Sequence, residues 1–341
     1  MTGTPPSSVV HLSVVITTDT TDDVTQTTGA NVVTSPSSRG IEFYFQCAVI
    51  VIGIVGTAAN ALIPYGFIAS KQHTKHRLIF HQNVLDFFGS LLMVITSSLK
   101  LCNFYFSGFD GLGFCILIHG EYFSWVVFLA GKINLIFVTI ERYLKVVYSV
   151  WSKNKLGNWM IYSAMAFAWI SGFVYETALL FPTSALIDGV CYAYAFWKSP
   201  AGMIVNGILF FFYFYVTVLI ILIFCYGHIL VVIRRQARVM ASHGSSTAHQ
   251  AHSQEIQTNV IKTMIIVSAS FAVCDMPINV YYMLRSVGSY TPPNYAVYYA
   301  SMFASFLYIC ANPFIYATKF DPVRNILLKL IPCKKTSSQP V

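Results

Sequence analysis

The sequence predicts an all-α membrane protein, a bundle of seven transmembrane helices followed by a short amphipathic helix. Of its 341 residues, 56% are hydrophobic and only 10% are charged, whereas a soluble domain carries about 25% charged residues. So few charges cannot cover a surface that faces water, so the chain must present apolar surface to lipid. The net charge of +8 lies in short segments between apolar runs, which is typical of membrane topology and not of a nucleic-acid partner.

The segment before the first apolar run, residues 1–43, predicts a disordered extracellular tail. Residues 1–40 are rich in Ser, Thr and Val and show no helical period. Residues 8–16 are mildly apolar but lack the basic region of a cleavable signal peptide. The first helix is therefore expected to serve as its own insertion signal.

Seven apolar runs follow, and each is long enough to cross a bilayer, which takes roughly 20 residues in a helix. Period-2 alternation is absent, and each span must satisfy its own backbone hydrogen bonds, so helices are predicted and barrel strands are not. No inverted repeat is evident, which disfavours a secondary transporter. Within the predicted seven-transmembrane domain, 44–318, the spans are 44–69, 78–101, 114–147, 159–181, 201–233, 258–286 and 295–318.

The distribution of basic residues predicts how the chain crosses the plasma membrane. The segments after helices one, three and five, their flanking ends and the C-terminal region hold 16 of the 21 Lys and Arg residues. The opposite side holds Arg39, Lys100, Lys198 and Arg285, and Lys132 lies within a helix. Because basic loops remain inside, the N-terminus is predicted to be extracellular and the C-terminus cytoplasmic.

Polar residues inside the apolar runs are costly in lipid and are candidates for function. In chain order they are Gly56 and Asn60, Asp86, Glu141-Arg142-Tyr143, Trp169, Cys274-Asp275-Met276-Pro277, and Asn312-Pro313-Phe314-Ile315-Tyr316. This ordered set resembles the motifs of the rhodopsin-like (class A) G-protein-coupled receptors, in a divergent, orphan-type form. One motif alone is a weak signal, but six in order, each on the expected helix, are a strong one, and the resemblance covers residues 44–333.

The resemblance implies an activation site at the cytoplasmic end. Glu141 would hold Arg142 in the resting state, and on activation Arg142 would swing inward to meet a heterotrimeric G protein. Gln257 stands where some members carry an acid that locks to this arginine, so that lock is expected to be missing. Arrestin and receptor kinases are further expected partners. The predicted coupling and activation residues are Glu141, Arg142, Tyr143, Val150, Tyr226, Asn312, Pro313 and Tyr316.

Three polar residues are expected to face one another in the centre of the bundle. Asn60, Asp86 and Asn312 would each cost several kcal/mol at a lipid-facing position. Pro277 and Pro313 remove backbone hydrogen bonds and bend their helices, as a two-state bundle requires. A sodium ion near Asp86 is the one bound ion that these residues suggest.

Two charged residues depart from the family pattern. Lys132 occupies a mid-membrane position that is normally apolar, and Asp275 replaces the usual Trp. Opposite charges at similar depth suggest that the two pair, with Asp86 as the competing partner for Lys132. Val218 replaces the usual proline of helix five, so the transmission geometry is expected to be atypical. The predicted polar core comprises Asn60, Asp86, Lys132, Asp275 and Asn312.

The class of ligand is limited mainly by residues that this sequence lacks. Ser124 stands where amine receptors of this family carry an Asp, although Glu121, nearly one turn higher, could still meet a cation. Phe306 replaces the lysine that an opsin needs, so retinal is excluded and no cofactor is expected. An aromatic or peptide ligand is favoured. The predicted pocket residues are Glu121, Tyr122, Ser124, Trp125, Phe128, Tyr282, Tyr298 and Met302.

The resemblance also implies a disulfide between Cys115 and Cys191 on the oxidising side of the membrane. Cys102 is the competitor for Cys191. The chain has 27 residues from Cys115 to Arg142, two more than the family usually has, so pocket positions counted from Cys115 are shifted.

A short amphipathic helix on the inner leaflet is predicted over residues 319–333, where apolar side chains recur every three or four residues. Cys333 follows it and is a candidate for S-palmitoylation. Residues 334–341 are then a cytoplasmic tail.

The sequence therefore predicts a G-protein-coupled receptor for an extracellular ligand. One alternative is a receptor that binds ligand with weak or no coupling to G protein. Another, less favoured, is a seven-helix ion or proton transporter with Asp86, Lys132 and Asp275 as its path, in which the motifs around Arg142 and Asn312 would have no role. An enzyme is disfavoured, because the sequence contains no nucleophile–base set or metal-ligand cluster.

Overall fold

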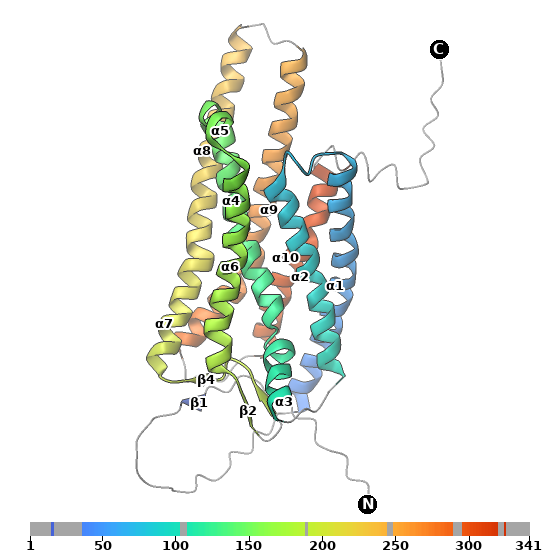
Figure 1. Cartoon of the computed structure of the whole chain (residues 1–341), viewed down its shortest axis with the longest axis vertical. Helices are drawn as coiled ribbons and strands as arrows, with labels where there is room; N and C mark the ends of the chain where they lie inside the picture. Colours follow the sequence, from blue (N-terminus) through green and yellow to red (C-terminus); the bar gives the residue numbers. More distant parts are fainter. Residues whose placement is uncertain are drawn as a thin grey trace, which may run out of the picture.

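The computed structural model describes residues 15–16, 36–102, 108–187, 190–243, 248–288, 295–319 and 324. Its long helices run side by side along the longest axis of the molecule (Figure 1). Within the described residues, seven helical spans are long and apolar enough to cross a membrane. The predicted all-α, seven-helix bundle is therefore confirmed.

Five of the spans are formed by single helices, because an apolar run in lipid satisfies its backbone polar groups only within itself. Pro277 lies inside α9 and Pro313 inside α10, where each removes one backbone hydrogen bond. The five helices are α1 (Pro36–Ala69), α2 (Arg77–Leu101), α6 (Asn158–Thr183), α9 (Ala248–Val287) and α10 (Tyr295–Lys319).

The third span is interrupted near its disulfide-bonded end. It consists of α3 (Gly108–Phe114), a π-helical turn (Cys115–His119) and α4 (Tyr122–Val147). Between the turn and α4, Glu121 adopts a φ of 53°, a left-handed conformation that residues with side chains rarely occupy. A π-turn holds more residues than an α-turn. The turn and the break both lie between Cys115 and Arg142, where the chain has two residues more than the family pattern.

The fifth span departs from α-helical geometry without a proline. It consists of α7 (Pro200–Phe211), a π-helical turn (Phe212–Val216) and α8 (Thr217–His243). Val218, which stands where the family usually has proline, is fully buried in the first turn of α8. Helix distortions arise at π-turns as well as at prolines, so this span is distorted just before the expected position.

Three helices are longer than the sequence predicted. α1 begins at Pro36 and not at residue 44, because a proline suits the first turn of a helix, where its missing N–H has no partner to lose. α8 continues to His243 and α9 begins at Ala248, beyond the predicted ends 233 and 258. Figure 1 shows both helices extending past the rest of the bundle.

The segments between the helices form small local elements. α5 (Ser149–Lys155) follows α4 at one end of the bundle. At the other end, β2 (Ala185–Ile187) pairs antiparallel with β3 (Val190–Tyr192). β4 (Phe196–Trp197) pairs in parallel with β1 (Val15–Ile16), so the tail predicted to be disordered over 1–43 contains a short strand and the start of α1.

The predicted helix 319–333 and the tail 334–341 lie outside the described residues, with two exceptions. Lys319 ends α10, and Arg324 is helical and exposed. Cys333 is among the residues that are not described.

α4 occupies the centre of the bundle, because it contacts α2, α6, α8 and α9. Its approach to α6 depends on Gly172, where an added Cβ would lie 2.5 Å from the backbone oxygen of Val126. Small residues let transmembrane helices pack closely in this way.

We expect Gly172→Ala to lower the stability of the folded protein by about 1–3 kcal/mol, because the new methyl group meets backbone that cannot move aside. Thermal unfolding of the purified chain in detergent measures this. Gly227→Ala in α8 is the matched control, since a Cβ there meets nothing within 4 Å, and helix propensity predicts a gain of up to about 1 kcal/mol. Equal midpoints for the two variants would contradict the close approach.

Candidate functional site

The two ends of the bundle carry different features, and we name them accordingly. The disulfide end holds the bond between Cys115 and Cys191, and the arginine end holds Arg142. Three features lie along the axis from one end to the other. They are a cavity at the disulfide end, a buried polar core in the middle, and the residues around Arg142.

A cavity of about 230 Å³ opens at the disulfide end. Residues from both ends of the chain line it, from Glu42 in α1 to Met302 in α10. Most of the wall is aromatic or aliphatic, with a few polar groups, as is usual for small-molecule sites. Five of the eight predicted pocket residues line it: Glu121, Trp125, Tyr282, Tyr298 and Met302.

The other three predicted pocket residues do not line the cavity. The Tyr122 hydroxyl lies 2.8 Å from the Thr177 hydroxyl, so this ring is directed toward α6. Phe128 lies deeper, with its ring centre 4.4 Å from the Lys132 ammonium. Ser124 is buried, and its hydroxyl has no hydrogen-bond partner among the described residues. All three residues follow the break at Glu121, which spacing alone did not reveal.

The charged residues of the cavity wall were mostly missed by sequence reasoning. Lys100 forms an ion pair with Glu121 at 2.5 Å, so Glu121 already has a cationic partner. The remaining charged residues in the wall are Glu42, Glu176 and Arg285. Glu176 could have been found, because an acid inside the apolar run of helix four is the same signal that identified Asp86.

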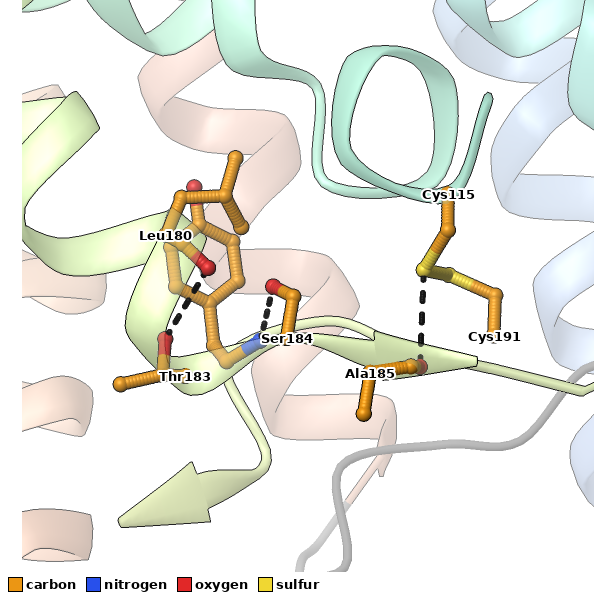
Figure 2. Close-up of a disulfide and its surroundings, with 7 residues drawn as sticks. Cys115, Leu180, Thr183, Ser184, Ala185 and Cys191 are labelled. Atoms are coloured by element: carbon orange, nitrogen blue, oxygen red, sulfur yellow. Dashed lines mark hydrogen bonds between the residues drawn. A yellow bond between two sulfur atoms is a disulfide. The ribbon is translucent and has the colours of Figure 1, made fainter. Parts of the chain in front are cut away.

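The disulfide holds a loop over the mouth of the cavity. Figure 2 shows Cys115, in the π-turn before α4, bonded to Cys191 on β3, with 5.3 Å between their Cα atoms. Cys102, the competitor, is a free thiol. The Ser184 hydroxyl accepts a hydrogen bond from the backbone of Tyr194, which continues the loop toward the cavity.

Lys132 and Asp275 form an ion pair in the middle of the bundle. The Lys132 ammonium lies 2.7 Å from Asp275 Oδ2, and both side chains are at most 3% exposed. Asn279 Nδ2 donates to Oδ2, and the Ser305 hydroxyl donates to Oδ1. The carboxylate is therefore contacted from α4, α9 and α10, and Lys132 does not pair with its other candidate partner, Asp86.

The aromatic ring of Phe210 connects this ion pair to the cavity. Its centre lies 5.4 Å from the Lys132 ammonium, within the range of a cation–π interaction. Phe210 also lines the cavity. A ligand in the cavity is thus one side chain away from the buried pair.

Asp86 lies at the end of a chain of directed hydrogen bonds. Trp169 Nε1 donates to His81 Nε2, and His81 Nδ1 then donates to the Asn134 carbonyl oxygen, at 3.0 and 2.9 Å. Asn134 donates to Gln82, and Gln82 donates to Asp86 Oδ1 at 3.2 Å. Because every donor is used by the next residue toward Asp86, the chain fixes a neutral histidine with its proton on Nδ1.

The three polar residues predicted to face one another, Asn60, Asp86 and Asn312, meet at this carboxylate and its backbone. Asn312 Nδ2 donates to Asp86 Oδ2 at 2.8 Å. Asn60 Nδ2 lies 3.4 Å from the backbone oxygen of Asp86 and 3.3 Å from that of Ile309. The side-chain oxygens of Asn60 and Asn312 are buried and have no partner among the described residues.

Arg142 is held by two neighbours at the arginine end, His76 and Glu141, and its side chain is only 8% exposed. Its Nη2 donates to His76 Nδ1 at 2.8 Å and lies 3.5 Å from Glu141 Oε2. Glu141 also pairs with Lys145 at 2.5 Å. Burial, followed by the positive charges of Arg142 and Lys145, lowers the pKa of His76 from its ordinary 6.5 to about 2, so His76 accepts as a neutral ring.

The remaining predicted activation residues lie around Arg142 without hydrogen bonding to it in the described part of the chain. The Tyr226 hydroxyl lies 3.3 Å from that of Thr139, and the Tyr316 hydroxyl donates to Met264 Sδ at 3.9 Å. Tyr143 contacts His228 at 3.1 Å. Val150 is 74% exposed on α5. His76 was missed, because a loop residue gives no sequence signal of its contact with helix three.

The sequence matches the family of seven-transmembrane receptors of the rhodopsin type over residues 44–316. The chain belongs to this family. Its members are receptors and not enzymes, and the seven spans make this receptor a multi-pass plasma-membrane protein. The resemblance drawn from the ordered motifs is confirmed.

One curated relative is the G-protein coupled receptor 3 of Rattus norvegicus. It is 26% identical to this receptor over 220 residues. The match covers 62% of this chain and 61% of the relative. The two receptors are thus compared over less than two thirds of either length.

We expect the stability of the receptor to fall as the pH drops below 6.5, because unfolding lets His76 take up a proton that its folded site refuses. The loss is at most about 1.4 kcal/mol per pH unit. Thermal midpoints of the purified chain between pH 7.5 and 5.0 measure it. His76→Gln, which cannot titrate, should show a shallower dependence, whereas His228→Gln, at an exposed histidine of the same end, should keep the wild-type slope. Identical slopes for all three proteins would contradict this assignment.

We expect Lys132→Met and Asp275→Asn each to destabilise the receptor by about 3–5 kcal/mol, since each leaves one buried charge without its partner. The double variant should lose clearly less than the sum of the two, which unfolding midpoints of all four proteins measure. Lys145→Met is the control, because this lysine is 34% exposed in its own ion pair and should cost at most about 1 kcal/mol. Additive losses would show that the pair is not coupled.

Proposed function

We propose that this receptor transmits the binding of an extracellular ligand in the disulfide-end cavity to a heterotrimeric G protein at the arginine end. The buried, hydrogen-bonded Arg142 supports this proposal most directly. An arginine held in a solvent-shielded site at the end of a central helix, beside Glu141 and His76, is available to a partner only after the helices move. A transporter gives such an arrangement no role.

The proposed orientation places the disulfide end outside the cell. The 16-to-4 distribution of Lys and Arg residues supports it, as does the presence of a disulfide, which forms in an oxidising compartment. The N-terminus is then extracellular and the C-terminus cytoplasmic. Val150 and its neighbour Trp151, both exposed on α5, form a small apolar surface on the cytoplasmic side that suits a protein partner.

The proposed switch is the ion pair of Lys132 with Asp275. It lies between the cavity and Arg142 and joins the third, sixth and seventh spans. Pro277, two residues beyond Asp275, is a point where α9 lacks a backbone hydrogen bond and can bend. Movement of α9 at this point would let Arg142 turn from His76 toward Tyr226 and Tyr316.

A sodium ion near Asp86 is part of this proposal. The carboxylate of Asp86 and the partnerless side-chain oxygens of Asn60 and Asn312 form an oxygen-rich set inside the bundle. Among the described residues, no cationic side chain pairs with Asp86. Such an ion would neutralise a buried carboxylate and stabilise the arrangement in which these three residues meet. We propose no retinal here, since Phe306 stands where an opsin carries the lysine for its Schiff base.

The second candidate function is a receptor that binds ligand but couples weakly. The observation in its favour is the substitution of the usual aromatic and proline residues by Asp275 and Val218, which are both fully buried. For the cytoplasmic side, we further propose arrestin and receptor kinases as partners. The amphipathic segment 319–333 would bind membrane lipid, and Cys333 would be palmitoylated.

We expect Arg142→Ala to reduce G-protein activation by at least about tenfold while the protein remains at the cell surface, because it removes the proposed contact with the G protein. Nucleotide exchange on a panel of G proteins, in membranes without ligand and with a ligand library, measures this alongside surface labelling. Lys153→Ala removes an exposed cation at the same end and should leave activation unchanged. Binding without any activation by the wild type would instead favour the weakly coupled receptor.

A further inference from the structure

We infer that Glu176 is the anchor for a cationic group, an ammonium or a guanidinium, of the ligand that occupies the disulfide-end cavity. This inference rests on the proposed function, since it assigns the chemistry of the ligand to that cavity. The sequence disfavoured amines because Ser124 stands at the usual helix-three position. The structure places a different acid, on helix four, in the wall of the same cavity.

Glu176 is a buried acid whose carboxylate has one hydrogen-bond partner among the described residues. Its exposed fraction is 2%, yet it lines the cavity. Within the described residues, its one hydrogen bond comes from the Tyr194 hydroxyl to Oε2 at 3.0 Å, and no cationic side chain forms an ion pair with it. A carboxylate offers about four acceptor positions, so most of its capacity is free for a ligand in the cavity.

The single donor is itself shared. The Tyr194 hydroxyl also lies 3.1 Å from the carbonyl oxygen of Gly120, and a hydroxyl has only one proton to donate. Burial, followed by the negative charge of Glu176, raises the pKa of Tyr194 well above its ordinary value, so Tyr194 supplies that one proton and no charge. A ligand that brings its own N–H donors would satisfy both acceptors.

The charged residues of the cavity wall favour the binding of one cation. Glu42, Glu121 and Glu176 are the acids of the wall, whereas Lys100 and Arg285 are its Lys and Arg residues. When Glu176 is ionised, three negative charges face two positive ones, and Lys100 is already joined to Glu121. An anionic ligand would add to the excess, whereas one ligand cation balances it.

The aromatic part of the wall suits the same ligand. Trp125, Tyr282 and Tyr298 line the cavity together with Glu176, and aromatic faces attract ammonium and guanidinium groups. Tyr194 reaches its position through a left-handed backbone with φ 57°. Such conformations cost free energy and gather at binding sites, as they do here at Tyr194 and at Glu121 in the same wall.

The test uses the full-length receptor in lipid nanodiscs and a matched pair of probes. Phenethylamine is protonated at neutral pH, and 2-phenylethanol has the same ring and chain without the charge. A short acetylated Phe-Arg amide presents a guanidinium cation on a peptide and distinguishes a peptide source from a free amine. Affinity is read from the rise in thermal midpoint with probe concentration, without any G protein present.

We expect the amine, the peptide or both to bind the wild type more tightly than the alcohol does. Glu176→Gln keeps the shape and the acceptor for Tyr194 but removes the charge, and it should weaken binding of the cation about 30-fold or more. Binding of 2-phenylethanol should be unchanged in this variant, which controls for damage to the cavity. Asp110→Asn, which removes an exposed acid at the disulfide end that does not line the cavity, should leave all affinities as in the wild type.

Three results would overturn the inference: equal binding of amine and alcohol, unchanged cation binding by Glu176→Gln, or no binding of either cation. These results concern the ligand alone. The Arg142→Ala experiment tests signalling separately, so a failed cation site and a failed receptor assignment give different patterns.

Discussion

The ion pair between Lys132 and Asp275 is the interaction on which the middle of the bundle depends. Neither charge can face lipid, and neither is stable alone in a buried site, so the two fix the relative rotation of the helices that carry them. Ser305 adds α10 through its bond to the same carboxylate. Because a buried pair can be exchanged for another arrangement only as a unit, these three helices are expected to have few discrete positions rather than a continuous range.

Asp86 meets the same physical problem in a different way. Its carboxylate accepts from two amides, Gln82 and Asn312, and has no cationic side chain beside it in the described structure. The hydrogen-bond chain that begins at Trp169 points its donors toward this acid, which spreads the stabilisation over three spans. Asp275 is thus stabilised by a cationic side chain, whereas Asp86 is stabilised by amide dipoles. Asp86 can therefore still bind a cation from solution.

The sequence predicted most of the architecture, because a polar residue inside a membrane helix is costly and has few favourable positions. The pairing of Lys132 with Asp275 followed from the cost of burying either charge alone, and the spans followed from their length. The cavity was predicted less well. Tyr122 and Phe128 were placed in it as aromatic residues in the outer halves of the helices, but a π-turn and the left-handed Glu121 interrupt the third span just before them. The contact of His76 with Arg142 depends on how a loop folds back, and no spacing rule encodes that.

The position of Phe210 explains how a ligand and the arginine end can influence each other. This ring forms part of the cavity wall and lies over the Lys132 ammonium, so a ligand that displaces it weakens a cation–π contact and changes the surroundings of the ion pair. The pair then responds through Asp275 on α9, close to the bend at Pro277. A ligand shifts the receptor only by its difference in affinity for the two arrangements. Phe210 and Glu176 lie on different helices of the cavity wall. The contacts that a ligand makes with them can therefore differ between the two arrangements of the receptor.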